Sequence, residues 1–481
     1  MILLSAVLLP ILTGALLPAL RWKQGARNLY IMASALLTSA LAAVAVLSDL
    51  PALELLSLNN KLSIMLRLDN LGKLFTALIA VLWPLTLLYA INYMKGAEKQ
   101  DSFFAFFLMT YGVTLGIAMA GNLLTLYVFY EIMTLSTLPL VMHGGSAKAV
   151  SAGLKYLYYS LGGSAFAFIG LVYLVYFGGN TVFQPGGQFS GVAIDHTAQL
   201  RLGYLLCFMG FSVKAAVFPV HGWLPTAAVA PTPVTALLHA VAVVKSGVFA
   251  IIRVTYFNFG VSVLIGSYAQ SIPLALSVFT IVFGCSMALK ERHLKRRLAY
   301  STVSNLSYIL FGALLMTSQG LAAGLMHLVF HAIMKITLFL TAGVFNKRAH
   351  AYYVEDMRGL GQAEALLSAV FVLGSLAMTG IPPLIGFVSK WSLAAAAVSS
   401  GGFLPIAGII ALLASALLTG IYLLVPSFSL YTHPINPHQE LLPVESGFKV
   451  TLIGLGAALL LLSFYNSPLL DFLARTALGA V

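Results

Sequence analysis

Residues 213–253 read VKAAVFPVHGWLPTAAVAPTPVTALLHAVAVVKSGVFAIIR, and this stretch decides how the rest of the chain is interpreted. Most of it is apolar, yet it contains Lys214 and Lys245. Proline lacks a backbone donor and breaks a helix interior, so Pro219 and Pro225 predict an interrupted helix. The stretch therefore predicts irregular helices that hold ionisable groups in apolar surroundings.

The composition places this stretch in a membrane. Of 481 residues, 60% are hydrophobic and 8% are charged, whereas soluble proteins average about 25% charged residues. Apolar runs of about 20 residues, enough to cross a bilayer, recur along the chain. We expect an all-α polytopic membrane protein with about fourteen transmembrane helices, and a soluble enzyme is excluded. The expected spans begin near residues 2, 28, 68, 102, 122, 151, 203, 232, 272, 298, 320, 364, 403 and 448.

Basic residues gather in alternate connections between these spans. They lie at 21–27, 95–99, 148, 290–297 and 347–358, after odd-numbered spans, and connections after even-numbered spans hold few. Positive charge stays on the cytoplasmic side. We therefore expect the odd connections inside and both termini outside, in a bacterial or archaeal cell membrane. Orientation also explains the net charge of +12 without nucleic acid as a partner.

A second proline interruption lies in GIPPLIGFVSKW, residues 380–391, at Pro382 and Pro383. Each interruption has a lysine near it, Lys214 in one case and Lys390 in the other. Broken helices at corresponding positions of two halves indicate an inverted repeat around an ion site near the middle of the membrane. The two segments do not themselves look alike, because proline follows the lysine in the first and precedes it in the second.

Few acidic groups are available to neutralise the buried lysines. Glu131 is the only acid deep in an apolar span, against Lys214, Lys245, Lys335 and Lys390. Burial disfavours the charged form of a lysine and so allows proton exchange near neutral pH. We predict that Glu131 acts on Lys214 by its charge. The alternative is a fixed ion pair that only positions two helices.

A polar stripe runs through HLVFHAIMKITLFLTAG, where His327, His331 and Lys335 follow one another at intervals of four residues. On a helix these side chains share one face, about 6 Å apart along the axis. Histidine passes protons through its two nitrogens, so the stripe suits a proton relay. The alternatives are a zinc site, for which no nearby acid or cysteine completes the ligands, and a structural polar seam. No metal or cofactor is expected, because Cys207 and Cys285 both lie in apolar runs.

His239 and Lys245 lie six residues apart, about 9 Å along a helix axis and not on one face. Water or a hydroxyl such as that of Ser246 is expected to bridge them to their neighbours. With the other buried groups they extend over spans five, seven, eight, eleven and twelve. This distribution predicts a path through the width of the protein, not a single pocket.

Four segments together resemble one known family. The stretch 213–253, KRRLAYSTVSNLSYI at 295–309, HLVFHAIMKITLFLTAG at 327–343 and GIPPLIGFVSKW at 380–391 resemble the signatures of antiporter-like subunits. Such subunits occur in respiratory complex I, membrane-bound hydrogenases and Mrp sodium/proton antiporters. The resemblance covers about residues 65–430.

The resemblance implies a fold of fourteen helices with two inverted five-helix repeats, each with a broken helix. It divides the chain into helices 1–3 (1–100), a first repeat (101–257), a second repeat (258–430), and a loop with helix 14 (431–481). It also implies that the buried groups form one proton-conducting axis. The groups are Glu131 with Lys214, then His239 with Lys245, then the connecting group His327, His331 and Lys335, and last Lys390.

We expect a proton-translocating subunit of a redox-driven complex, without a redox centre of its own, beside other antiporter-like membrane subunits and lipid. A sodium/proton antiporter subunit of the Mrp type is the alternative with the same fold. A structural spacer, a stand-alone transporter of an organic substrate and a quinone- or hydrogen-reducing enzyme fit the buried groups less well. Thr226 departs from the family, because many members carry an acid there.

Overall fold

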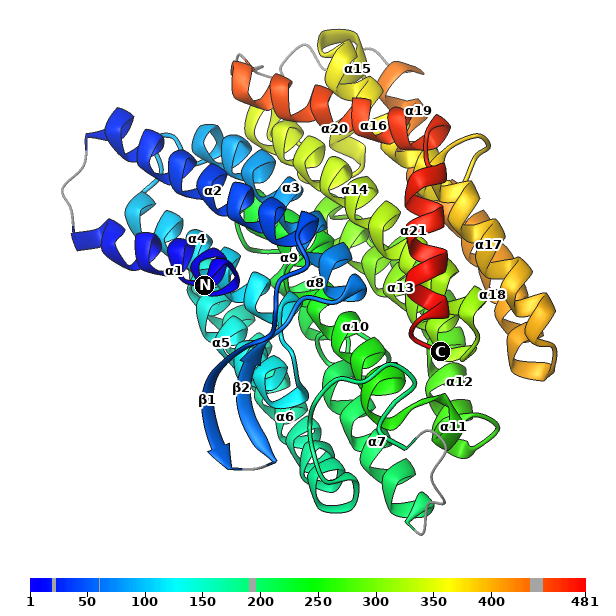
Figure 1. Ribbon diagram of the computed structural model, residues 1–481. Coiled ribbons are helices and arrows are strands. Elements are labelled where there is room, and N and C mark those ends of the chain that lie inside the picture. Colours follow the sequence, from blue (N-terminus) through cyan, green and yellow to red (C-terminus); the bar gives the residue numbers. More distant parts are fainter. Residues whose placement is uncertain (20–22, 60, 190–195, 433–443) are drawn as a thin grey trace.

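The computed structural model describes residues 1–19, 23–59, 61–189, 196–432 and 444–481. Within these ranges, eleven helices are long and apolar enough to cross a membrane. The fold is that of a polytopic helical membrane protein (Figure 1). Arg21 and most of the expected loop at 431–447 lie outside the described residues.

The first half of the chain forms mostly antiparallel helices joined by short connections. Their bounds are α1 Ile2–Leu16, α2 Gln24–Leu47, α3 Asn70–Tyr93, α4 Gln100–Ala118, α5 Leu123–Val141, α6 Ala147–Tyr173, α7 Thr197–Ser212, α8 Trp223–Ala227, α9 Thr232–Ala240 and α10 Val243–Arg253. Short 3-10 or π segments continue α1 to Ala19, α6 to Gly178 and α10 to Phe259.

The second half continues in the same manner. Its helices are α11 Val261–Leu264, α12 Tyr268–Lys290, α13 Leu294–Leu314, α14 Ser318–Ala349, α15 Leu360–Ala363, α16 Ala365–Thr379, α17 Ile385–Ser400, α18 Phe403–Thr419, α19 Val425–Thr432, α20 Ser446–Phe464 and α21 Ser467–Leu478. A 3-10 turn occupies Glu355–Met357, and a π segment, Gly420–Leu424, joins α18 to α19. A helix begins near every expected span start, and the largest difference is at the seventh, expected near 203 and beginning at Thr197.

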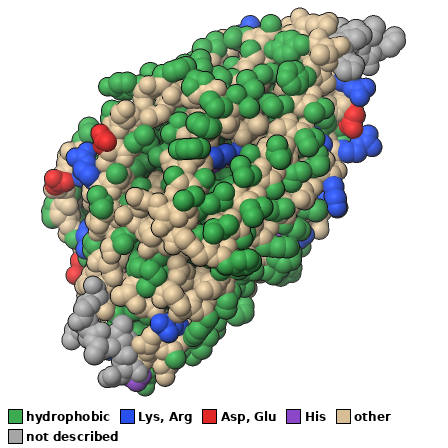
Figure 2. Space-filling model, turned by 90° about the vertical axis from the view of Figure 1, so that its right-hand side faces the viewer, with side chains coloured by type: hydrophobic (Ala, Val, Ile, Leu, Met, Phe, Trp, Pro, Cys, Tyr) green, Lys and Arg blue, Asp and Glu red, His purple; other side chains and the backbone are tan. Residues whose placement is uncertain are grey.

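The centre of the molecule is formed by α14 and by the α9–α10 segment. Both are completely buried over an 18-residue window, whereas α1 and α2 are one-third buried and lie at the periphery. Figure 1 shows α14 running through the middle of the bundle. On the face in Figure 2, hydrophobic side chains cover the middle and most charged groups lie toward the ends, as a lipid-facing surface requires.

A two-stranded antiparallel hairpin interrupts the helical pattern between α2 and α3, where no regular element was expected. Its strands, β1 Leu53–Asn59 and β2 Leu62–Leu66, pair Leu53 with Leu66 and Ser57 with Ser63. The hairpin projects from the helices in Figure 1. Each strand is only five to seven residues long. Its apolar residues therefore form a run too short to cross the membrane.

The connections form two separate sets of contacts. Among connections after odd-numbered spans, Arg27 pairs with Asp101 at 3.0 Å and His293 forms a β-bridge with Tyr353. Among those after even-numbered spans, Asn122 forms a β-bridge with Val182. Odd and even connections therefore lie on opposite faces, in agreement with the alternation of positive charge.

Both chain ends lie on the even-connection face. The backbone amide of Gly186, in the connection after α6, donates to the carbonyl of Ala480 at 3.1 Å. Near the N-terminus, Gly14 packs on Ala105 and Val7 on Gly112, so α1 runs antiparallel to α4 and begins beside the end of α4. The terminal helix α21 was not expected; it follows α20 after a short break.

Candidate functional site

The helix breaks position the ionisable groups. Helix α7 ends at Ser212 and α8 begins at Trp223, so Lys214 and Pro219 lie in unwound chain. Ala216 in this segment has a left-handed φ of 55°. Pro382 and Pro383 lie between α16 and α17. A third break, at Val241 and Ala242 between α9 and α10, carries no proline, so nothing in the sequence pointed to it.

Lys245 and His331 form the central contact of the site. Nζ of Lys245, on α10, lies 2.9 Å from Nδ1 of His331, on α14. Both side chains are completely buried. A direct bond of this kind allows a proton to move from one group to the other without an intervening water. The two residues were predicted to be on one path, and the structure brings them together.

His327 extends this contact toward α17. Its ring is stacked on that of His331, with centroids 5.9 Å apart. Nδ1 of His327 lies 2.9 Å from Oγ of Ser389, and Nε2 lies 3.1 Å from Oδ1 of Asn305. Ser389 directly precedes Lys390 in α17, so this hydrogen bond reaches the helix that follows the second break.

Lys390 lies at the open end of a helix. Its Nζ donates to the carbonyl oxygens of Met378, at 2.8 Å, and Thr379, at 2.9 Å, where α16 ends. These carbonyls have no partner within their own helix, and the C-terminus of a helix attracts a positive charge. Lys390 therefore supplies hydrogen-bond donors to the free carbonyls at the end of α16. Its side chain is half-buried at this break.

Lys335 is turned away from the Lys245–His331 pair. Its Nζ donates to the Leu298 carbonyl at 2.9 Å and to the Ser301 hydroxyl at 2.8 Å, both on α13. Helical spacing places His327, His331 and Lys335 on one stripe, but they contact different helices. The step from this group to Lys390 stays a prediction; of the three side chains, His327 bonds toward α17 and Lys335 toward α13.

Lys214 and Glu131 interact through their charges without a direct bond. Nζ of Lys214 donates to the Tyr130 carbonyl and lies 3.5 Å from the centroid of the Tyr130 ring. The carboxylate of Glu131 is within electrostatic range of Lys214, and its Oε1 has no hydrogen-bond partner among the described residues. This arrangement disfavours the alternative of a fixed ion pair.

His239 is buried and stacks on Phe339, with centroids 4.7 Å apart. Neither of its ring nitrogens has a hydrogen-bond partner within the described chain. The Ser246 hydroxyl donates to the Ala242 carbonyl at 2.8 Å. Among the described residues, no group of three or more His, Cys, Asp and Glu side chains is placed to hold a metal ion.

Arg253 and Lys295 are also buried basic residues near the ends of spans, outside the predicted path. Arg253 makes two bonds to Asp69, at 2.5 and 2.7 Å, and is surrounded by aromatic rings. Lys295 donates to the Ala230 carbonyl at 2.9 Å. Their positions at span ends are typical of anchoring residues. Their hydrogen-bond partners could not be predicted from the sequence.

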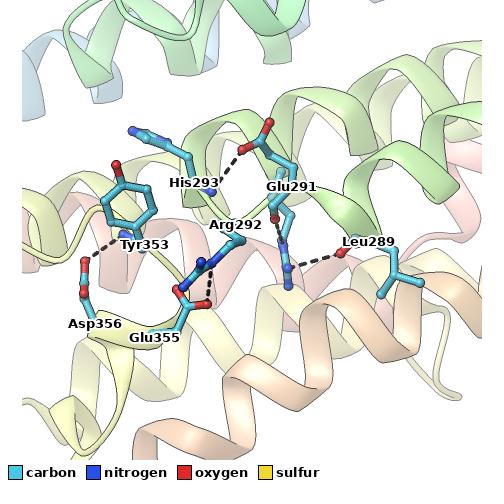
Figure 3. A network of polar contacts seen from close by, with 8 residues as sticks. Leu289, Glu291, Arg292, His293, Tyr353, Glu355 and Asp356 are labelled. Atoms are coloured by element: carbon cyan, nitrogen blue, oxygen red, sulfur yellow. Dashed lines mark hydrogen bonds and ion pairs between the residues drawn. The ribbon is translucent and has the colours of Figure 1, made fainter.

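A network of polar contacts joins two of the connections that follow odd-numbered spans (Figure 3). Arg292 pairs with Glu355 at 3.0 Å, and Arg297 donates to the Glu291 carbonyl at 2.8 Å. A hydrogen bond from its own backbone and one from Arg292 hold the pKa of the Glu355 carboxyl below its usual value. The network ties the connection before α13 to the one after α14.

The fold and the buried line of lysine and histidine define a class, that of polytopic membrane proteins with an ionisable interior. Residues 120–419 match the family described as NADH:quinone oxidoreductase/Mrp antiporter, transmembrane. The chain belongs to this family. The match covers the breaks and every predicted path residue.

Curated relatives from both branches of the family are similar to the chain. The NADH-quinone oxidoreductase subunit N of Desulforudis audaxviator is 30% identical over 429 residues, which cover 85% of this chain and 84% of the relative. One subunit of the Na(+)/H(+) antiporter of Alkalihalophilus pseudofirmus is 30% identical over 86% of this chain. The chain spans about half of that second relative, 54% of its length.

Solved structures share the fold over nearly the whole chain. A chain of the membrane-bound sulfane sulfur reductase, an archaeal respiratory membrane complex, superposes with a TM-score of 0.88 at 24% identity, covering 100% of this chain and 97% of that one. A chain of the Mrp complex from Dietzia gives 0.83 at 22%, covering 99% and 97%. A chain of respiratory complex I from Thermus thermophilus gives 0.82 at 24%, covering 99% and 98%.

Proposed function

We propose that this chain is a proton-translocating, antiporter-like subunit of a redox-driven membrane complex of the complex I or membrane-bound hydrogenase kind. The observation that carries the proposal is the 2.9 Å contact between Lys245 and His331 in the fully buried centre of the bundle. Ionisable groups inside a membrane protein are costly and mark ion pathways. A purely structural polar seam does not need two titratable groups bonded to one another.

The path has two terminal segments around this centre. On one side, Glu131 acts by its charge on Lys214 at the first break. On the other, His327 bonds to Ser389, the residue before Lys390 at the second break. A change in the charge of Glu131 shifts the proton affinity of Lys214, then that of Lys245 and the groups beyond it. His239 takes part through ordered water, since its nitrogens have no partner in the described protein.

The domain division and orientation belong to the same proposal. Residues 101–257 and 258–430 form two inverted repeats, supported by breaks in the fourth span of each segment. Helices before residue 100 and after 431 flank them. Odd connections face the cytoplasm and both termini lie outside, supported by the basic residues at 290–297 and 347–358 on one face.

A subunit of an Mrp-type sodium/proton antiporter is the second candidate. The similarity to the antiporter of Alkalihalophilus pseudofirmus favours it. The fold does not separate the two, because complexes of both kinds superpose on the chain. In both cases the partners are other membrane subunits, and this chain contributes the ion path.

Purification in mild detergent from the native membrane, followed by mass spectrometry, separates the candidates. Co-purifying iron–sulfur, hydrogenase or dehydrogenase subunits support the redox-driven complex. Only small membrane subunits and other antiporter-like chains, with proton movement that depends on sodium, support the Mrp type. Glu131→Gln in an assembled complex that moves protons at the full rate would contradict the path itself.

A further inference from the structure

A second set of hydrogen-bonded groups leaves Lys335 on the side opposite to His331. Ser301 Oγ accepts from Lys335 at 2.8 Å and from the Tyr422 hydroxyl at 2.8 Å. Tyr422 lies 3.2 Å from Oγ1 of Thr419. Tyr422 is in the π segment Gly420–Leu424 between α18 and α19, a helix form that recurs at functional sites.

Cys285, on α12, continues the set toward the second break. Its Sγ is 3.7 Å from Thr419 Oγ1, 3.9 Å from Tyr422 Oη and 2.8 Å from Ser415 Oγ. The Tyr308 hydroxyl, next to Ser415, donates to the Leu412 carbonyl at 3.3 Å. In the described chain, Cys285 is the side chain that connects the Thr419–Tyr422 pair to Ser415.

The set ends beside Lys390. Nζ of Lys390 lies 5.6 Å from the centroid of the Tyr308 ring. The members of the set, Ser301, Tyr308, Cys285, Ser415, Thr419 and Tyr422, are all at most 1% exposed. Solvent therefore does not reach them by an open surface.

We infer that these hydroxyls and the thiol form a second proton route from Lys335 to Lys390, parallel to the route through His331, His327 and Ser389. The inference rests on the proposed function. The two routes use different helices: the histidine route uses α14 and α17, and the hydroxyl–thiol route uses α12, α13 and the α18–α19 region.

The transfer balances along the chain of groups. Lys335 gives one ammonium proton to Ser301, each member passes on its own proton in turn, and neutral Lys390 gains one through Tyr308 or a water beside it. No hydroxyl or thiol changes its net number of protons. Hydroxyl hydrogens rotate, so the chain can point in either direction. Cys285 is the weakest member, because a thiol is a weak donor and acceptor.

The chain offers a matched control for Cys285. Cys207 is equally buried but lies on α7, where its Sγ faces the Ala167 carbonyl at 3.8 Å, away from both routes. Alanine at either position removes one buried sulfur atom. Only Cys285→Ala interrupts the hydroxyl–thiol route, and Cys285→Ser restores a group that donates and accepts.

The test uses the complete complex in proteoliposomes, with a potassium diffusion potential and an internal pH dye. Each cysteine variant is made alone and with His327→Gln, which impairs the histidine route. In the His327→Gln background, we expect Cys285→Ala to lower proton movement at least about tenfold relative to Cys207→Ala, and Cys285→Ser to restore it. With His327 intact, we expect a smaller loss, because the parallel route remains open.

The outcomes separate this inference from the proposed function. Equal rates for Cys285→Ala and Cys207→Ala in the His327→Gln background, in complexes that assemble equally, overturn the second route. If that happens while Lys245→Met still impairs proton movement, the proposed function stands. If the unmodified complex moves no protons at all, both fail.

Discussion

At the scale of single residues, the proposed proton path differs from the ion pairs that hold helices in place. Arg253 is fully buried and holds Asp69 with two bonds, while Asp69 caps α3 by accepting from the Gly72 amide at 2.9 Å. This pair connects the end of α10 to the start of α3. It therefore sets the position of the helix that carries Lys245.

Replacement of Arg253 by methionine leaves the Asp69 carboxylate without its partner. We expect a loss of about 3 kcal/mol in stability, the lower end of the cost of breaking a buried pair, since Asp69 is 27% exposed. Thermal unfolding in detergent measures it. Lys73→Met is the control: its partner Asp49 is 98% exposed, so little change is expected. Equal unfolding temperatures for the two variants would contradict the assignment.

The buried lysines and histidines could be picked out from the sequence, but their contacts could not. Lysine and histidine stand out in apolar runs because burial of a charge is costly. Helical spacing also grouped His331 with Lys335. Which nitrogen meets which oxygen depends on side-chain directions across helices far apart in the sequence, and so Ser301 and Tyr422 were missed. Hydroxyls carry no such cost, so they do not stand out among apolar residues.

At the scale of elements, glycines allow backbones to meet at the two breaks that contain proline. A Cβ on Gly247, in α10, would overlap the amide nitrogen of Ala215, in the first break. A Cβ on Gly386, in α17, would overlap the carbonyl oxygen of Ala377, in α16. Neither approach leaves room for a side chain. The prolines predicted two breaks, but the close approach of neighbouring helices appears only in three dimensions.

Gly247→Ala forces α10 away from the unwound segment that holds Lys214. We expect a destabilisation of about 1–3 kcal/mol from overpacking, together with slower proton movement. Gly454→Ala, in α20, meets nothing within 4 Å. That control is expected to be neutral or to stabilise its helix by up to about 1 kcal/mol. Unfolding temperatures of the two variants decide the matter, and an unchanged value for Gly247→Ala would refute close packing at the break.

At the scale of the whole molecule, the two faces differ in charge and in contacts. Loops after odd spans bond to one another, as do loops after even spans, and the C-terminal end joins the even set through Gly186 and Ala480. The alternation of charge in the sequence predicted this separation. The hairpin β1–β2 and the terminal helix α21 were not predicted, because both are too short to register as spans.

The proposed orientation predicts how introduced cysteines react with a membrane-impermeant thiol reagent. Both native cysteines are fully buried and should not react. In intact cells without a cell wall or outer membrane, Val481→Cys is expected to be labelled. Lys99→Cys is expected to be protected until the membrane is permeabilised. Both positions are exposed, so the comparison is between sides of the membrane. Reversed labelling would place both termini in the cytoplasm.

The proposed proton path depends above all on the buried contact between Lys245 and His331. Lys245→Met keeps the length of the side chain and removes the titratable group. The rate of proton movement by the complete complex in proteoliposomes, normalised to assembled complex, is the direct measurement. We predict a loss of at least about a hundredfold. An assembled Lys245→Met complex that moves protons at the unmodified rate would contradict the proposed path.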